Sequence, residues 1–446
     1  MSSRHPFDDD VSAILSTAEL PNPLMTFDEK REELAAAHRL IRAGYDAGTP
    51  FFTKELFRDF VRQLESNTDD RISVIGLDRF AVHFPIETGN VYRSHPYGDE
   101  FACFMYECHD FSLSAATIPT CRCPLTLFLL VFPNELLTSA KPRLQYRTIQ
   151  DLLTEQDPNC YSVCRAYLPV EVVHATEVRN AHTNEVANLW PTADYATTKL
   201  KLEQMKRSLE ASDCFALIKS TLTSSGVSPS IEKVVALGWS TIPLPKDDDV
   251  MSSMVQHTLA LAIRDLLANL YPENARSIHC YAQDPFYTPV DEQVLSEAGF
   301  TLVDDPRAFL DVDEASVVIT MNPDIPVRQI VADIARPAMM IWNKVAVSDP
   351  DRRVQVPVLG RSRALTAASS DPVSSRVIQM MKEYIEVPFP AQNDHFGDIA
   401  IYVRRQDTME EGPTAVCEQV PEMKRTFNQC GASSRFRLPV CFHEER

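Results

Sequence analysis

Short apolar runs alternate with amphipathic stretches throughout residues 231–405. The run at 234–237 is apolar at every position and ends at Gly238, which is typical of a strand that a parallel sheet buries on both faces. An apolar stripe at helical spacing follows over 251–270, and the next strand is expected at 278–282. A strand, a helix and a strand in this order connect through a right-handed crossover. The segment therefore predicts an α/β fold with a Rossmann-like, doubly wound and mostly parallel sheet.

The same alternation continues to the end of this segment. We expect helices at 290–298, 327–335 and 373–384, and strands at 300–303, 317–321, 339–342 and 399–403. The first two strands, 234–237 and 278–282, are predicted to lie parallel and next to each other. Leu259 and Leu266 lie on the helix between them, and their spacing predicts that both are buried.

The first half of the chain has a different pattern. Helical stripes occupy 27–45 and 53–64, with Thr53 as the capping residue of the second, and another spans 195–222. Over 71–168, short apolar runs separated by turn residues predict strands and long loops. We therefore divide the chain into a flexible N-terminus (1–27), an N-terminal α+β extension (28–225), the Rossmann-type domain (226–405) and a polar C-terminal tail (406–446).

The charge of the chain limits its partners. Its 43 basic and 62 acidic residues give a formal net charge of −19, which argues against a chain that coats nucleic acid or an anionic membrane. The longest apolar stretch, 125–132, is far shorter than the ~20 residues of a membrane-spanning helix, and the N-terminus does not have the pattern of a signal peptide. Eleven cysteines without a secretory signal favour the cytosol or, as the alternative, the nucleus.

One group of cysteines invites comparison with a zinc site. The group comprises Cys103, Cys108, His109, Cys121 and Cys123. Zinc sites usually contain C-x2-C pairs, whereas the pairs here are separated by four residues and by one. We therefore expect scattered core thiols and no metal site.

Polar residues follow four of the predicted strands. Because parallel strands bring their carboxyl ends to one edge of the sheet, these residues are expected to line one crevice where the strand order reverses. We predict that the crevice binds a ligand through Gly238, Trp239, Ser240, Gln256, Asp284, Phe286, Thr288, Asn322, Asp324 and Asn343. Asp284 can act as a base or bind ribose hydroxyls, and His257 can move protons near neutral pH. The alternative interpretation is structural: Asp284 braces its own turn, and Asn343 bonds a loop.

Short motifs in the same segment resemble those of a known family. The matching motifs are Gly238-Trp239-Ser240-Thr241, Gln256-His257-Thr258-Leu259-Ala260, Asp284-Pro285-Phe286-Tyr287-Thr288, Pro323-Asp324-Ile325-Pro326 and the asparagine of Trp342-Asn343-Lys344. With them, residues 231–345 resemble the SRR-like domain, named after the plant protein "sensitivity to red light reduced". The first motif lacks the second glycine of the family, and the fourth keeps the prolines without the histidine and cysteine. The segment 50–56 is similar to fungal members that extend the domain.

The resemblance implies a Rossmann-type domain without a settled catalytic activity. The family is linked to light and circadian signalling in plants, and to haem metabolism and cytoskeletal phenotypes elsewhere. Our first hypothesis is therefore a regulatory or small-ligand-binding protein. The second is a small-molecule tailoring enzyme or transferase that uses S-adenosylmethionine or a nucleotide, and the third is a protein-interaction scaffold.

The first turn of the domain argues against one further class of enzyme. Trp239 and Ser240 occupy this turn, where a conventional NAD-dependent dehydrogenase needs glycines so that the backbone can approach the pyrophosphate. We expect a small molecule or a protein as the partner, and neither nucleic acid nor a membrane. No cofactor follows from the motifs.

Overall fold

The computed structural model describes fifteen segments of the chain. They are residues 26–66, 70–89, 101–107, 127–133, 135–154, 163–180, 182–186, 194–224, 230–242, 250–271, 278–346, 353–358, 361–367, 369–389 and 396–405. The expected flexible N-terminus up to residue 25, the C-terminal tail from 406 and the predicted thiols Cys108, Cys121 and Cys123 lie outside these segments, as does His109.

A seven-stranded sheet has the order β14-β15-β11-β10-β7-β8-β9. Its five parallel strands are β7 (Lys233–Leu237), β8 (His279–Gln283), β9 (Thr301–Leu302), β10 (Ser316–Ile319) and β11 (Met339–Asn343). Two antiparallel strands extend the sheet beyond β11. β15 (Ile399–Arg404) pairs with β11, and β14 (Tyr384–Pro388) pairs with β15 and is the edge strand. The chain passes from β7 through β8 to β9 and then returns to β10 on the other side of β7, so the strand order reverses between β7 and β10. The predicted doubly wound sheet and the parallel pairing of its first two strands are confirmed.

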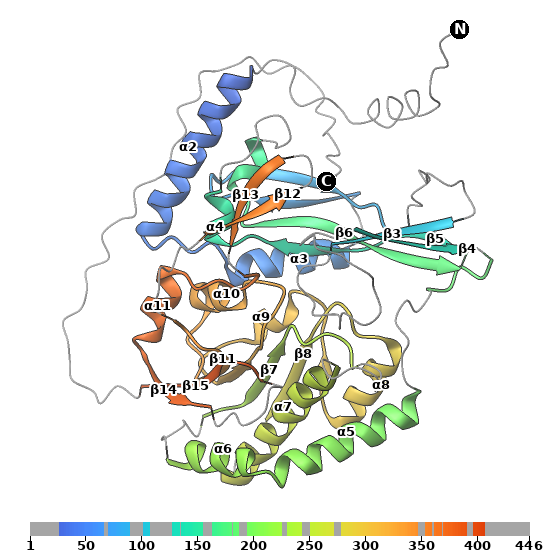
Figure 1. Ribbon diagram of the computed structural model, residues 1–446. Coiled ribbons are helices and arrows are strands. Elements are labelled where there is room, and N and C mark those ends of the chain that lie inside the picture. The colour runs from blue at the N-terminus through green and yellow to red at the C-terminus, as the bar shows by residue number, and fades with distance from the viewer. Residues whose placement is uncertain are drawn as a thin grey trace, which may run out of the picture.

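Helices cover both faces of this sheet (Figure 1). One face carries α5 (Tyr195–Glu210), α6 (Asp213–Ser224), α7 (Val250–Leu270) and α8 (Pro289–Ala298), and the other carries α9 (Arg307–Asp311), α10 (Val327–Ile334) and α11 (Ser375–Met381). Alternate residues of β7 point to opposite faces, because successive side chains of a strand do so. Val234 and Ala236 belong to the core on the α7 side, and Val235 and Leu237 to the core on the α9 and α10 side.

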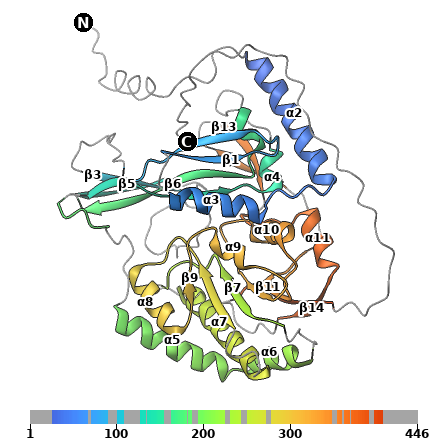
Figure 2. The same cartoon turned by 180° about the vertical axis from the view of Figure 1, so that it is seen from behind.

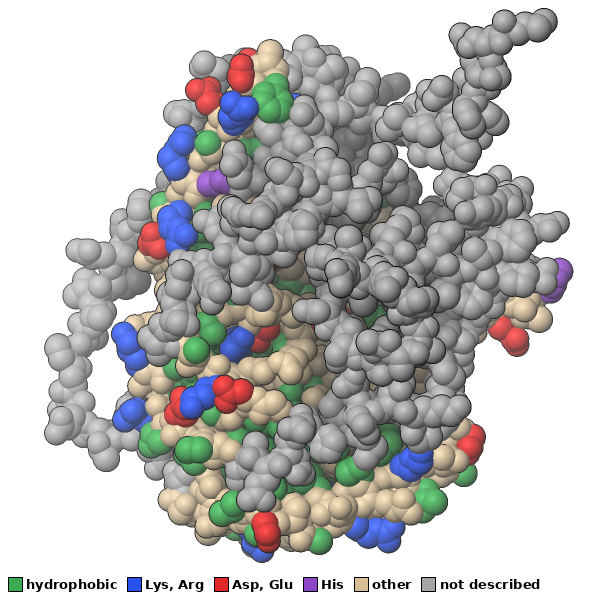
Figure 3. Space-filling view, in the orientation of Figure 1, with side chains coloured by type: hydrophobic (Ala, Val, Ile, Leu, Met, Phe, Trp, Pro, Cys, Tyr) green, Lys and Arg blue, Asp and Glu red, His purple; other side chains and the backbone are tan. Residues whose placement is uncertain are grey.

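The crossover helix α7 is buried as predicted. Leu259 and Leu266 are 0% and 5% exposed. Outside it, α5 packs on both α7 and α8 and leaves its own outer face to solvent. Leu200 of α5 and Leu217 of α6 are about half exposed, and Figure 3 shows hydrophobic side chains interspersed with charged ones over the helices at its lower edge. None of the helices in the described segments combines the length and apolar character that crossing a membrane requires.

Two helix predictions need correction. The stretch 195–222 forms two helices, because the chain turns after Glu210 and the Ser212 Oγ accepts the Phe215 N–H at 3.1 Å to begin α6. The stretch 373–384 forms a shorter helix that ends at Met381, and the unpredicted strand β14 begins at Tyr384. Pairing with β15 outweighs continuation of the helix, since the Tyr384 side chain is buried and its hydroxyl donates to the Pro337 carbonyl at 2.8 Å.

The N-terminal region consists of helices and two-stranded sheets. Its elements are α2 (Phe27–Asp46), α3 (Lys54–Ser66), β1 (Arg71–Ile75), β2 (Ala81–Pro85), β3 (Phe101–Glu107), β4 (Leu127–Pro133), β5 (Glu135–Tyr146), α4 (Ile149–Leu152), η1 (Val163–Tyr167) and β6 (Val170–Asn180). Later in the chain, β12 (Arg353–Val358) and β13 (Arg361–Ala367) form another pair on this side of the molecule. The predicted helices at 27–45 and 53–64 are confirmed, and Thr53 caps the second through a bond from the Leu56 N–H at 3.1 Å.

The N-terminal region packs on the sheet face that carries α9, α10 and α11, as both Figure 1 and Figure 2 show. Its apolar side chains form one continuous core with that face. Asp333 of α10 accepts the N–H groups of Phe51 and Phe52, and Gln329 accepts the Ile149 N–H at 3.0 Å. The N-terminal region and the α/β domain are therefore joined by buried polar contacts as well as by apolar packing.

Candidate functional site

The carboxyl ends of β7 and β10 meet where the strand order reverses. Three residues there have a left-handed backbone: Gly238 with a φ of 70°, Ser240 with 60° and Asn322 with 49°. Position 238 requires glycine, because a Cβ atom there would lie 2.8 Å from the Cβ of Pro323. The end of β7 therefore lies directly against the loop that follows β10.

Asp284 connects the ends of β7 and β8. Its Oδ2 accepts the Ser240 N–H at 2.6 Å, and its Oδ1 accepts the Phe286 N–H at 2.9 Å. Burial raises the pKa of the Asp284 carboxyl, although the two hydrogen bonds oppose that shift. The structure thus brings Asp284 and Ser240 together as predicted. The bond to Phe286 also fits the alternative interpretation, in which Asp284 braces its own turn.

Asn322 and Asn343 connect the ends of β10 and β11. The Asn322 N–H donates to the Asn343 Oδ1 at 2.8 Å, and the Asn343 Nδ2 donates to the Asn322 Oδ1 at 2.7 Å. The Asn322 side chain is exposed and Asn343 is half-buried. The pair holds two amide groups at the surface between neighbouring strand ends.

Two more of the predicted residues lie exposed beside these pairs. We define the strand-end cluster as Ser240, Asp284, Phe286, Asn322, Asp324 and Asn343. The Phe286 side chain is 50% exposed, although large aromatic side chains are usually buried. The negative charge of Asp324 contributes to raising the pKa of Asp284. The cluster therefore presents carboxylates and amides next to an open aromatic ring.

A buried ion pair supports the loop after β10. The Arg328 Nε donates to the Asp371 Oδ2 at 2.8 Å, and the Arg328 N–H donates to the Asp371 Oδ1 at 3.0 Å. Both side chains are less than one-tenth exposed. The neighbouring Ser370 hydroxyl donates to the Pro323 carbonyl at 2.6 Å, so the segment around residues 370 and 371 holds the loop after β10 in place.

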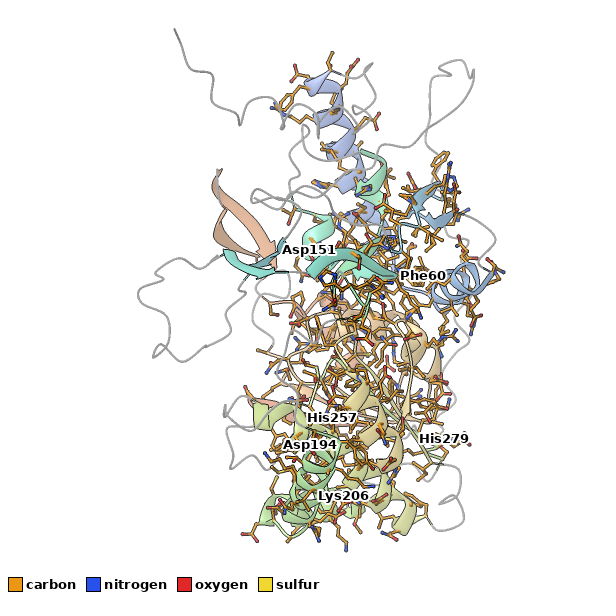
Figure 4. The ribbon with its side chains drawn as sticks, turned by 90° about the vertical axis from the view of Figure 1, so that its right-hand side faces the viewer. Phe60, Asp151, Asp194, Lys206, His257 and His279 are labelled. Carbon is orange, nitrogen blue, oxygen red and sulfur yellow. The ribbon has the colours of Figure 1, made fainter. Side chains whose placement is uncertain are left out.

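Trp239, Gln256 and His257 lie in the core, with exposed fractions of 3%, 8% and 0%. The His257 Nδ1 lies 2.7 Å from the Ser253 carbonyl and donates to it, while the His257 Nε2 accepts the Tyr287 hydroxyl at 2.9 Å. Burial lowers the pKa of His257 to about 4, so the ring is neutral at physiological pH. Figure 4 shows His257 among packed side chains of the α/β part. This placement favours a packing role over the proton transfer hypothesised from the sequence.

Thr288 has a structural role at the start of α8. Its hydroxyl accepts the Asp291 N–H, and the Asp291 carboxylate accepts the Thr288 N–H at 2.8 Å, which forms a capping box. The Asp291 carboxylate also accepts the Thr241 hydroxyl at 2.5 Å and the Ile242 N–H at 3.0 Å. Asp291, which the sequence analysis did not select, therefore fixes the loop after β7.

The N-terminal region reaches the carboxyl end of β8. The Tyr146 hydroxyl of β5 donates to the Asp305 Oδ1 at 2.6 Å, and the Gln283 Nε2 donates to the same oxygen at 2.8 Å. The Gln283 Oε1 accepts the Ala308 N–H at 2.8 Å. Burial raises the pKa of the Asp305 carboxyl to about 6, and the bond from Tyr146 opposes this shift.

Arg143 of β5 lies close enough to Asp305 and Asp284 for their charges to act on it. Burial lowers the pKa of the Arg143 guanidinium, and the two carboxylates oppose that shift. Sequence reasoning missed both Arg143 and Tyr146, because they lie more than a hundred residues before the strands that they approach. No local pattern in the sequence marks either residue.

Metal binding finds no support in the described part of the chain. There, no group of three or more His, Cys, Asp or Glu side chains is placed to hold a metal ion. The strand-end cluster offers two carboxylates that interact with each other by charge, together with amides, which suits hydrogen bonding to a polar organic molecule.

The fold and the cluster together define a doubly wound α/β domain with polar strand ends. Residues 205–403 match the family model of the SRR1 domain, which supports the resemblance to the SRR-like domain that the motifs indicated. The match begins within α5, before the boundary at residue 226 that we expected from the sequence. Because α5 and α6 belong to the core around α7, we propose that the domain includes both helices.

No curated protein matches the chain. Among solved structures, the chain is similar to an O-methyltransferase family protein from Burkholderia thailandensis, with 11% sequence identity and a TM-score of 0.25. The match covers 49% of this chain and 61% of that protein, which is less than two thirds of its length. At this TM-score the similarity supports no conclusion about function.

Proposed function

We propose that this SRR1-domain protein is regulatory and binds a small polar ligand at the strand-end cluster. The observation that carries the proposal is the left-handed backbone of Ser240 and Asn322, in the loops that follow the adjacent strands β7 and β10, at the point where the strand order reverses. Ligands of doubly wound sheets bind at this position. A non-glycine residue in this conformation costs about 1–3 kcal/mol and is typical of functional sites.

The side chains of the cluster suggest the chemistry of the ligand. The Asp284 carboxylate can accept hydrogen bonds from hydroxyl groups, and the amides of Asn322 and Asn343 can accept hydrogen bonds from them and donate hydrogen bonds to them. The open ring of Phe286 offers an apolar face for a flat aromatic group. A molecule with both features is a nucleoside, and we propose this class of ligand.

The experiment is a binding titration with purified protein. A thermal-shift screen of nucleosides, nucleotides and S-adenosylmethionine finds a ligand, since tight binding raises the melting temperature. Asp284→Asn should then weaken the binding of that ligand by about 1–3 kcal/mol, because a charge-assisted hydrogen bond is lost. The matched control is Asp398→Asn, which removes an exposed carboxylate at the same edge of the sheet and should leave the affinity unchanged. Equal affinities of wild type and Asp284→Asn would refute the proposal, as would a screen without any thermal shift.

A transferase or tailoring enzyme is the second candidate. The raised pKa of Asp284 favours it, because acid–base groups in enzymes often have such shifts. Incubation with S-adenosylmethionine and a cell extract as the source of methyl acceptors tests this hypothesis, because transfer of the methyl group to an acceptor releases S-adenosylhomocysteine. Release that disappears in Asp284→Asn supports an enzyme, whereas binding without turnover supports the regulatory function.

We also propose that the protein acts in the cytosol or nucleus, without nucleic acid or a membrane as partner. The net charge of −19 supports the exclusion of these two partners, because an acidic chain is repelled by nucleic acid and by an anionic membrane. The similarity of 50–56 to fungal members stays a prediction about origin.

A further inference from the structure

The segment before α11 is held by two buried glutamines, one from the N-terminal region and one from the α/β domain. We define this segment, residues 370–373, as the clamp segment. The Gln150 Nε2 of α4 donates to the Val373 carbonyl at 3.0 Å, and the Gln329 Nε2 of α10 donates to the Pro372 carbonyl at 3.1 Å. The Gln329 Nε2 also donates to the Gln150 Oε1 at 3.0 Å. Both glutamines are less than one-tenth exposed, so the N-terminal region holds the clamp segment through buried amides.

The clamp segment also contacts the ends of two strands of the sheet. Its Asp371 carboxylate accepts the Arg328 Nε at 2.8 Å, and the same guanidinium donates through Nη1 to the Asn343 carbonyl at 3.4 Å. Its Ser370 hydroxyl donates to the Pro323 carbonyl at 2.6 Å. A continuous set of hydrogen bonds therefore leads from α4 to the end of β11 and to the loop after β10.

Both of these contacts lie at the strand-end cluster. Pro323 stands between Asn322 and Asp324 in the sequence, and it packs so closely on the end of β7 that a Cβ atom at Gly238 would lie 2.8 Å from its own Cβ. The two hydrogen bonds between Asn322 and Asn343 depend on the spacing of the loop after β10 and the end of β11. Because a buried polar network with all its partners has one favoured arrangement, the clamp segment fixes that spacing.

We propose that Gln150 and the clamp segment position the strand-end cluster, so that the docking of the N-terminal region regulates how tightly this site binds its ligand. The inference rests on the proposed function and deepens it, because it assigns a regulation to the same site. Gln150 and Ser370 are positioning residues, which act on the ligand through Asn322 and Asn343. Loosening α4 lowers the affinity without removing any residue of the cluster.

Hydrogen exchange measured by mass spectrometry tests the positioning without any ligand. The reporter is the peptide with the Asn322 N–H, which donates to the Asn343 side chain. Ser370→Ala removes the bond to Pro323, and Gln150→Met removes the bonds of Gln150 with a side chain of similar length. Both should speed exchange of this N–H by about two- to tenfold, as the loss of one hydrogen bond does. Exchange in β7 should stay unchanged, since a general loss of stability would raise it there too.

A titration then tests the regulation of binding. The probes are adenosine, guanosine, cytidine and uridine, measured by calorimetry. Ser370→Ala and Gln150→Met should weaken the binding of the nucleoside that the wild type prefers by about two- to tenfold. Ser370→Thr keeps a hydroxyl and should behave like the wild type in both measurements. Ser369→Ala, at the exposed neighbouring position, is the matched control and should also behave like the wild type.

The outcomes separate the inference from the proposed function. Unchanged exchange of the Asn322 N–H in Gln150→Met would overturn the role of the N-terminal region, whether or not a nucleoside binds. Faster exchange that extends to β7 would show a merely structural role and would overturn the inference as well. Faster exchange confined to the cluster, with unchanged nucleoside affinity, would overturn the regulation and leave the proposed function standing. Absence of binding by every nucleoside would refute the proposed function itself, and the regulation of binding with it.

Discussion

Replacing Asp305 by asparagine tests whether a buried carboxyl joins the N-terminal region to the α/β domain. The Asp305 Oδ1 accepts hydrogen bonds from Tyr146 and Gln283, and an asparagine Oδ1 can accept both. The substitution removes the ionisable proton and exchanges the second oxygen for an amide nitrogen. The substitution therefore changes the free energy of unfolding in two ways. The lost acceptor has the same effect at every pH, and the lost ionisable proton has an effect that depends on pH.

The magnitude of the pH-dependent part follows from the pKa of Asp305. Burial raises this pKa from the ordinary value of 3.8 to about 6 in the folded protein. The difference is about two pKa units, and each unit corresponds to about 1.4 kcal/mol, so the effect is at most about 3 kcal/mol. A raised carboxyl pKa means that the folded state binds the proton more tightly than the unfolded state. The stabilisation by this proton is complete below about pH 4 and is lost as the pH rises through about 6.

The assay is urea unfolding of the wild type and of Asp305→Asn at several pH values between 4 and 7. The free energy of unfolding of the variant, minus that of the wild type, should rise with pH across this window by up to about 3 kcal/mol. Taking the difference between the two proteins cancels the titration of the other carboxyl groups. Asp213→Asn on α6, an exposed position, is the control, and its difference should stay nearly flat. A constant difference for Asp305→Asn would show that the carboxyl is not perturbed and that the reasoning is wrong.

Three further substitutions test the packing around the site. Leu259→Ala should lower the free energy of unfolding by roughly 2–5 kcal/mol, because this side chain is completely buried on α7, and an unchanged denaturation midpoint would contradict that. Asp371→Asn should destabilise the protein by roughly 3–5 kcal/mol, since it leaves the Arg328 guanidinium buried without its carboxylate, and a loss below about 1 kcal/mol would mean that solvent reaches the pair. Gly238→Ala should cost roughly 1–3 kcal/mol through its positive φ and the contact with Pro323; a melting temperature equal to that of the wild type would show that the loop after β10 moves freely.

Much of the α/β domain was predictable from the sequence, because its strands are short, mostly apolar runs and its helices have a clear apolar stripe. These local patterns also imply topology, since a strand, helix and strand in sequence have one favoured handedness. The closeness of Asp284 and Ser240 followed from the same rule, because parallel strands end at one edge. β14 was missed because it is a short edge strand that directly follows a helix.

The sequence did not allow us to predict which side of a helix is exposed to solvent. His257 lies on α7, and a doubly wound sheet leaves one side of such a helix open unless another element covers it. Here α5 packs on α7 from before the expected domain boundary, and the His257 ring itself packs against Trp239, Tyr287 and Phe300. A histidine expected in a crevice is consequently a neutral core residue.

The sequence by itself determined the alternation of strands and helices, the parallel pairing of the first two strands and the polar residues after the strands, since all of these follow from local patterns of residues. Only the tertiary structure decided which of those residues reach the surface and which supports lie beneath them. Arg143 and Tyr146 come from a strand that is distant in sequence and reaches Asp305 only because the N-terminal region shares a core with one face of the sheet. Such packing depends on the shapes of two complete surfaces, and no local pattern of residues encodes it.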